Sequence, residues 1–451
     1  MVHVFSLEDH FYVLDEHSGS VMQIDKLAAQ VIERFETEST EKIAAALSGQ
    51  YASEDIVDVL KEIQELRDQG MLFSPPESPV DLSGEKVIKA LCLHVTHDCN
   101  LRCRYCFAGE GAFHGDRCLM PIEVGKAALE FLMVRSGRRR NLEVDFFGGE
   151  PLMNWDVVKD LVVYGRQLEK EYGKNIRFTI TTNGLALDAE KIAYINQEMS
   201  NVVISLDGRP EIHDHMRPTP SGQGSYHRIV AKAKELINNR EGSYYVRGTF
   251  TRHNLDFDKD VVALAQEGFQ NISIEPVVSA ASADYSLLEE HLPVIQEAYE
   301  RLAKLVVFPV ANAKPFQFFH FMLDLNNGAC AKKRLTGCGA GNEYAAITPT
   351  GDIYPCHQFV GEEQFKLGNV LEGTWNEERQ DMFRQNHVLS KPKCSACWAK
   401  HFCSGGCAAN AWHRNGDIAR PYEMECEMEK KRLECGIAIY CQKKNGTINQ
   451  V

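Results

Sequence analysis

The chain has 451 residues, of which 44% are hydrophobic and 25% charged, so it can bury a full core and is expected to divide into two or three domains. Its net charge of −14 offers no basic surface for nucleic acid or for an anionic membrane. No run of about 18 apolar residues and no export signal occurs, so we expect a cytoplasmic protein. In that reducing compartment the fifteen cysteines favour metal sites over disulfides.

Residues 1–75 begin with the alternating segments VHVFSL, FYVLDE and SVMQID and continue with helical spacing. A small sheet followed by helices is the layout of a winged-helix unit. Three prolines then stop regular structure, and we expect a linker at 76–87. A DNA-binding winged helix is the alternative for this unit. Its helical segments AAQVIERF and EDIVDVLKEI are acidic and poor in Arg, which disfavours DNA.

From 88 to 315, six strand-like runs alternate with amphipathic helices: IKALCLHVT, LEVDFFGG, IRFTITTNG, NVVISLDG, YYVRGTF and ISIEPVV. This alternation predicts an α/β fold with a parallel sheet curled into a partial (β/α)6 TIM-like barrel. Functional residues of such barrels lie at the C-terminal ends of the strands. Several runs finish there in polar or Gly-rich segments, namely FFGGEP, ITTNG, ISLDG and IEP.

Residues 316–451 lose the regular apolar period, and loops, glycines and cysteines dominate. A hairpin is expected in YAAITPTGDIYPC, with its turn at Thr350-Gly351-Asp352. A segment this poor in apolar spacing needs another source of order, and metal clusters can supply it.

The first group of cysteines is CNLRCRYC, in which Cys99, Cys103 and Cys106 follow the first barrel strand. Three thiolates can ligate three irons of a 4Fe-4S cube, which leaves the fourth iron for a small chelating cosubstrate. The amino and carboxylate groups of S-adenosylmethionine (SAM) suit that iron. Zinc is the alternative, although it usually takes four closed ligands in CxxC pairs.

This CxxxCxxC spacing, with Tyr105 before the last Cys and FFGGEP one strand later, resembles the radical SAM superfamily over residues 88–310. The resemblance implies that the reduced cluster cleaves SAM to methionine and a 5′-deoxyadenosyl radical, which abstracts a substrate hydrogen. It implies that GGEP binds the SAM amino group and that strand-end residues lie near its ribose and methionine. The residues expected to contact SAM are Tyr105, Gly148, Gly149, Glu150, Thr182, Asn183, Ser205, Asp207 and Arg217.

The second group of cysteines resembles the SPASM extension of peptide-modifying radical SAM enzymes. By the family's interleaving, one auxiliary 4Fe-4S cluster is expected on Cys394, Cys397, Cys403 and Cys426, and another on Cys338, Cys356 and Cys407. With the SAM cluster this makes three 4Fe-4S clusters. The second auxiliary cluster is one ligand short, so either Cys330 completes it or its open iron takes a thiolate from the substrate. Zinc is again the alternative, suggested by the Cys394 and Cys397 pair.

The whole chain resembles the SCIFF-type maturases, which form thioether (sactionine) crosslinks in a Cys-rich peptide. Residues 1–75 resemble the PqqD-like leader-recognition domain of such enzymes, which captures a leader peptide as an added strand. The resemblance implies a ribosomally made Cys-rich precursor peptide as partner, Cys-to-Thr crosslinking, and a low-potential electron donor such as ferredoxin or flavodoxin.

Two alternatives remain for the function. An anaerobic sulfatase maturase makes formylglycine with similar motifs but carries an Asp after the second SPASM cysteine, where this chain has His357. Another SPASM peptide modification is the broader form of the same alternative. A non-catalytic iron-sulfur carrier would explain the cysteines but not GGEP, SLDG and Arg217.

Overall fold

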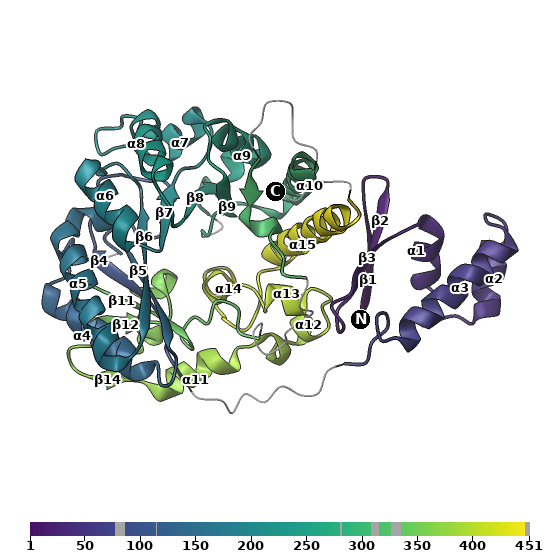
Figure 1. Cartoon of the computed structure of the whole chain (residues 1–451). Helices are drawn as coiled ribbons and strands as arrows, with labels where there is room; N and C mark the ends of the chain where they lie inside the picture. Colours follow the sequence, from purple (N-terminus) through teal and green to yellow (C-terminus); the bar gives the residue numbers. More distant parts are fainter. Residues whose placement is uncertain (77–85, 114, 280–281, 308–314, 326–334, 447–451) are drawn as a thin grey trace.

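The computed structural model describes residues 1–76, 86–113, 115–279, 282–307, 315–325 and 335–446. Strands β4 to β9, between Ala90 and Pro276, form a parallel part of its large sheet, which Figure 1 shows on the left of the molecule with helices on its outer side. The C-terminal segment lies beside these strands, and a small N-terminal unit lies at the opposite end of the molecule. Among the described residues, no helix combines the length and the apolar character needed to cross a bilayer.

The N-terminal unit is a three-stranded antiparallel sheet covered on one face by three helices. Its sheet order is β1-β2-β3, so that β1 and β3 are edge strands. Val13 of the sheet packs against Val31, Ile43 and Ile56 of the helices. Its elements are β1 (Val2–Leu7), β2 (His10–Asp15), β3 (Val21–Ile24), α1 (Lys26–Ile32), α2 (Thr40–Leu47) and α3 (Ser53–Asp68).

The opposite face of this small sheet packs on the C-terminal part of the chain. Phe5, Tyr12 and Leu14 form one buried cluster with Ile437 and Ala438 of the last helix. Figure 1 shows this last helix, α15, between the barrel and strands β1–β3. The sheet of the N-terminal unit is therefore buried on both faces. One face packs on helices α1–α3, and the other packs on α15.

The predicted alternation of strands and helices from 88 onward gives the expected partial barrel, in the order β4-β5-β6-β7-β8-β9 with every pair parallel. Its strands are β4 (Ala90–Thr96), β5 (Asn141–Gly148), β6 (Asn175–Thr182), β7 (Asn201–Ser205), β8 (Ser243–Phe250) and β9 (Asn271–Pro276). Its helices are α4 (Ile122–Arg135), α5 (Trp155–Tyr172), α6 (Ala189–Glu198), α7 (Pro210–Met216), α8 (Tyr226–Asn238), α9 (Phe257–Gln266) and α10 (Leu292–Val307).

The C-terminal segment extends both edges of the barrel sheet. Strand β10 pairs with β9, and β11 pairs in parallel with β4 before β12, β13 and β14 follow in antiparallel order. The hairpin predicted around Thr350-Gly351-Asp352 joins β11 to β12, with Gly351 at φ +88°. The remaining elements are β10 (Gln317–Phe318), β11 (Tyr344–Ile347), β12 (Asp352–Tyr354), β13 (Gly368–Asn369), β14 (Thr374–Trp375), α11 (Glu377–Gln385), α12 (Pro392–Ser395), α13 (Lys400–Cys403), α14 (Ala408–Asn415) and α15 (Glu423–Lys444).

Candidate functional site

Three cysteines share the loop that follows β4, at the C-terminal end of the first barrel strand. The Leu101 N–H donates to Cys99 Sγ at 3.4 Å, and the Asn183 side-chain amide lies 3.7 Å from the same sulfur. Burial, together with the charges of Glu150 and of the neighbouring thiols of Cys103 and Cys106, raises the pKa of the Cys99 thiol to about 12. Thiolates this close together and this shielded are costly without a cation. The three thiols therefore fit a bound metal cluster.

The GGEP segment packs its backbone directly on this loop. The Gly149 N–H donates to the Thr96 carbonyl and the Glu150 N–H to the Asp98 carbonyl, both at 2.9 Å. Gly148 adopts φ +128°, and a Cβ atom there would lie 2.1 Å from the Thr96 carbonyl oxygen. Only glycine allows so close an approach at this backbone angle.

Glu150 is fully buried and directs its carboxylate into the protein. It accepts from Thr182 Oγ1 at 2.6 Å, from the Asn183 N–H at 2.8 Å and from the Leu152 N–H at 3.0 Å. Burial raises its pKa to about 7, against those three hydrogen bonds. The carboxylate thus joins the ends of β5 and β6.

The SLDG segment fixes the aromatic residue of the cysteine loop. Asp207 is fully buried and accepts from Tyr105 Oη at 2.8 Å, from Arg217 Nε at 3.0 Å and from the Thr249 N–H at 3.0 Å. The Arg217 guanidinium also lies over the Tyr105 ring, 5.3 Å from its centroid. Arg217 is therefore paired through its Nε with a protein carboxylate. Ser205 ends β7 beside this group and is partly exposed.

The barrel interior carries polar residues that the sequence analysis did not assign. Asp145 of β5 and Arg247 of β8 face it, together with Glu275 of β9. His357 lies near them, and burial, followed by the charge of Arg247, lowers its pKa to about 4. Alternation of polar and buried residues in LEVDFFGG was the signal available, because every second residue of a barrel strand faces inward.

Cys338, Cys356 and Cys407 come together in the C-terminal segment. Burial raises the pKa of the Cys356 thiol, and Cys407 and Cys338 raise it further because their thiols lie close by. Cys356 also raises the pKa of the Cys92 thiol in β4 and of the Tyr344 hydroxyl in β11. It therefore lies close to both strands. Cys330 lies outside the described residues.

The other four expected cysteines of the C-terminal segment line one cavity of about 340 Å³. Lys393, Lys400 and Lys430 lie along the same cavity, close enough to offset the charge of bound thiolates. A single cavity lined by four cysteines fits one metal cluster. These cysteines are Cys394, Cys397, Cys403 and Cys426.

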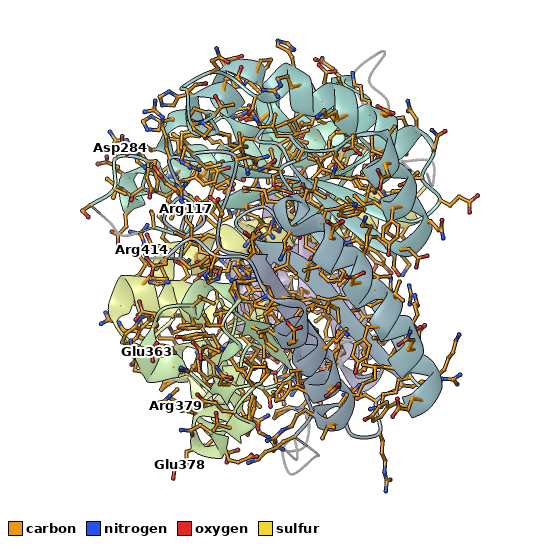
Figure 2. All side chains as sticks on the ribbon, turned by 90° about the vertical axis from the view of Figure 1, so that its left-hand side faces the viewer. Arg117, Asp284, Glu363, Glu378, Arg379 and Arg414 are labelled. Carbon is orange, nitrogen blue, oxygen red and sulfur yellow. The ribbon has the colours of Figure 1, made fainter. Side chains whose placement is uncertain are left out.

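Charged side chains surround the cysteine loop on the surface. Figure 2 labels Arg117, Asp284 and Arg414 along one edge of the molecule. Arg117 pairs with Asp98 at 3.5 Å and with Glu110 at 3.7 Å, and both partners belong to the cysteine loop. These ion pairs lie on the exposed outer side of the loop.

Two family models match the chain. Residues 93–256 match the radical SAM superfamily, and residues 338–398 match SPASM, an iron-sulfur cluster-binding domain. The chain carries a radical SAM domain and a SPASM domain. These domains imply 4Fe-4S clusters and SAM as its cofactors.

Known proteins similar to this radical SAM/SPASM chain include two curated relatives. "Mycofactocin maturase MftC" of Mycobacterium ulcerans is 28% identical, over 71% of this chain and 83% of the relative. The "Cysteine-type anaerobic sulfatase-maturating enzyme" of Clostridium novyi is 24% identical, over 72% of this chain and 89% of the relative. The crystal structure of Streptococcus suis SuiB bound to precursor peptide SuiA shares the fold at a TM-score of 0.54 and 15% identity, covering 93% of this chain and 97% of that one.

A Gly149→Ala substitution in the radical SAM domain is expected to impair both SAM binding and cluster retention. The added methyl group would lie 2.1 Å from the Asp98 carbonyl oxygen, so the cysteine loop must move. Strain from such overpacking costs about 1–3 kcal/mol. Equilibrium SAM binding and iron analysis of the reconstituted protein measure the effect. Gly49→Ala is the control, since nothing lies within 4 Å of a Cβ atom there. Unchanged SAM affinity in Gly149→Ala would contradict this account of the motif.

Proposed function

We propose that this protein is a peptide maturase that forms an intramolecular Cys-to-Thr thioether in a Cys-rich, ribosomally made precursor peptide. The names of its relatives support peptide modification, since one is a maturase, one a sulfatase-maturating enzyme, and SuiB is bound to a precursor peptide. The resemblance to SCIFF-type maturases supports the thioether. A low-potential donor such as ferredoxin or flavodoxin would supply electrons.

In this proposal Cys99, Cys103 and Cys106 bind the SAM-cleaving cluster. When bound and reduced, that cluster supplies the electron that splits SAM and so starts hydrogen abstraction from the peptide. The chain's own part is to position the cosubstrate and to exclude water from it. The expected SAM contacts are Tyr105, Gly148, Gly149, Glu150, Thr182, Asn183, Ser205, Asp207 and Arg217. Of these, Glu150 and Asp207 act through the residues that they fix, because both are fully buried.

The observation that carries the thioether is the place of Cys356, beside Cys92 of barrel strand β4 and Tyr344 of β11, which pairs with β4. A cluster on Cys338, Cys356 and Cys407 would thus face the barrel interior, where the peptide must react. With three ligands, one iron is free for a substrate thiolate unless Cys330 completes the set. The second auxiliary cluster would use the cavity of Cys394, Cys397, Cys403 and Cys426.

The N-terminal unit is proposed to bind the leader of the peptide. Both edge strands, β1 and β3, lack a further strand partner within the described part of the chain. An exposed sheet edge can accept an extended peptide through main-chain hydrogen bonds. The domain organisation is then leader recognition at 1–75, a linker at 76–87, the radical SAM barrel at 88–315 and the SPASM domain at 316–451.

Formylglycine formation on a sulfatase is the second candidate, favoured by the sulfatase-maturating relative. His357 disfavours it, because the sulfatase maturases carry an Asp at this position. Burial, followed by the charge of Arg247, lowers the pKa of His357 to about 4, so its imidazole is a weak base and does not replace the carboxylate.

Tandem mass spectrometry of a Cys-rich peptide encoded beside this protein tests the proposal. The peptide is incubated with SAM and the reduced, reconstituted protein. We expect a loss of two hydrogens per crosslink, with fragments that join a Cys to a Thr. Loss of sulfur from a Cys would support formylglycine instead, and the absence of SAM cleavage would support an electron carrier.

A further inference from the structure

Asp145 projects into the barrel interior from β5. Its strand neighbours Val144 and Phe146 are fully buried in the core between sheet and helices, so Asp145 lies on the opposite, interior face. Thr181 of β6 donates its hydroxyl to the carboxylate at 3.1 Å. Asp145 remains partly exposed in this position. It is therefore a carboxyl group that a bound molecule in the barrel can reach.

Arg247 of β8 lies in the same interior and is half exposed. Its Nε is 3.7 Å from a carboxylate oxygen of Glu275 on β9, which is too long for a hydrogen bond. The Glu275 carboxylate instead has two other partners, because it accepts from Ser273 Oγ at 2.9 Å and pairs with His320 at 3.1 Å. The guanidinium of Arg247 thus has capacity for an anionic group that enters the barrel.

The two interior carboxyl groups have opposite environments. Burial raises the pKa of Asp145 to about 7, and Thr181 and Arg247 lower it only in part. Burial also raises the pKa of Glu275, but the positive charges of His320, Arg247 and Arg432 outweigh it and hold that pKa well below its usual range. A pair of carboxyl groups with such separated pKa values marks a proton-transferring group and a permanently ionised one.

The other groups around Asp145 do not change their charge near neutral pH. Four elements face it: Cys92 on β4, Thr181 on β6, Arg247 on β8 and Tyr344 on β11. Burial raises the pKa of both the Cys92 thiol and the Tyr344 hydroxyl well above their usual values, so both stay protonated at neutral pH. Asp145 is the group of this set that changes its charge near pH 7.

We propose that Asp145 is the general base that takes the proton from the peptide thiol, while Arg247 stabilises the resulting thiolate. This inference rests on the proposed function and deepens it. The S–H bond breaks, its electron pair stays on sulfur, and the proton moves to a carboxylate oxygen of Asp145 and later to solvent. A free Cys thiol has a pKa of about 8.5, so a carboxylate that titrates near 7 can accept its proton at modest cost.

Asp145→Asn tests this role, because the amide oxygen can still accept from Thr181 while the base is lost. We expect crosslink formation to fall by about 100-fold or more, whereas SAM cleavage to 5′-deoxyadenosine stays within about twofold. In the unaltered protein, initial rates of crosslinking should rise with pH through about 7 and level off above it, since the base works only when ionised. Asp145→Glu should restore part of the rate together with the pH dependence.

Glu143→Gln is the matched control, since Glu143 lies on the same strand, two residues away, and is exposed. Crosslinking by Asp145→Asn within twofold of the unaltered protein, or with an unchanged pH profile, would overturn the inference. Equal losses of crosslinking and SAM cleavage would also overturn it, because they indicate a structural role. If the unaltered protein forms no thioether at all, the proposed function itself fails, which is a different result.

Discussion

Replacement of Cys99, Cys103 and Cys106 together by alanine is expected to abolish SAM cleavage and to leave the SPASM iron in place. The three thiols share one loop, where Cys103 and Cys106 raise the pKa of Cys99 by their proximity, so their removal takes away the whole protein ligand set of this cluster. The SPASM cysteines lie on other segments and form their own groups. Chromatographic detection of 5′-deoxyadenosine measures cleavage, and iron and sulfide analysis measures what remains bound.

Cys118→Ala provides the control for this experiment. Cys118 is half-buried and lies close to the same loop, where its carbonyl accepts from the His97 N–H at 2.8 Å. Its thiol is not part of the expected ligand set, so cleavage should be unchanged. Continued production of 5′-deoxyadenosine by the triple variant would contradict the assignment of these cysteines.

The sequence predicted the convergence of the strand-end motifs, because carboxyl ends of parallel strands meet at one edge of a sheet. Glu150 of GGEP does contact Thr182 and Asn183 of TTNG, and Asp207 of SLDG does contact Tyr105 of the cysteine loop. These contacts join segments that are 32 to 102 residues apart. Motif order along the chain was sufficient for this part, since each motif ends a recognisable strand.

The direction in which each motif side chain points was not predictable. The sequence placed Arg217 among the expected SAM contacts but did not show that its Nε pairs with Asp207 of the same chain. Nor did it show that Glu150 of GGEP is fully buried and accepts hydrogen bonds from Thr182, Asn183 and Leu152. Such choices depend on which neighbouring backbone N–H groups need an acceptor, and that requires the folded geometry.

The polar residues of the barrel interior were not predicted, because their surroundings also depend on the folded geometry. Asp145 gains its environment from Thr181 on the next strand and from Arg247 three strands away. The stagger of a barrel decides which of these side chains share a level, and a single sequence carries no record of it. The docking of the N-terminal sheet on α15 is equally hidden, since the Gln442 side chain donates to Tyr12 Oη across 430 residues.

Glu16→Ala is expected to lower the free energy of unfolding by about 3 kcal/mol, because it leaves a buried cation without its counter-ion. Glu16 follows β2 and is fully buried against the C-terminal segment. Its carboxylate pairs with Lys400 Nζ at 2.9 Å and with His401 Nε2 at 2.8 Å. Both partners lie between Cys397 and Cys403, so the same substitution should weaken iron retention at that cavity. Thermal unfolding and iron analysis of the reconstituted protein measure the two effects.

The matched control is Glu62→Ala, which removes an exposed carboxylate from helix α3 of the same unit. Combining Glu16→Ala with Lys400→Met should recover part of the lost stability, since the unpaired cation is then removed as well. Burial raises the pKa of Glu16, but His401 and Lys400 lower it by more, so the folded pKa lies below its ordinary value. The stabilisation by Glu16 is therefore present at neutral pH and is lost as the pH falls through that lowered value. A Glu16→Ala protein that unfolds at the same temperature as the Glu62→Ala control would show that the N-terminal sheet is secured by its apolar contacts with α15 alone.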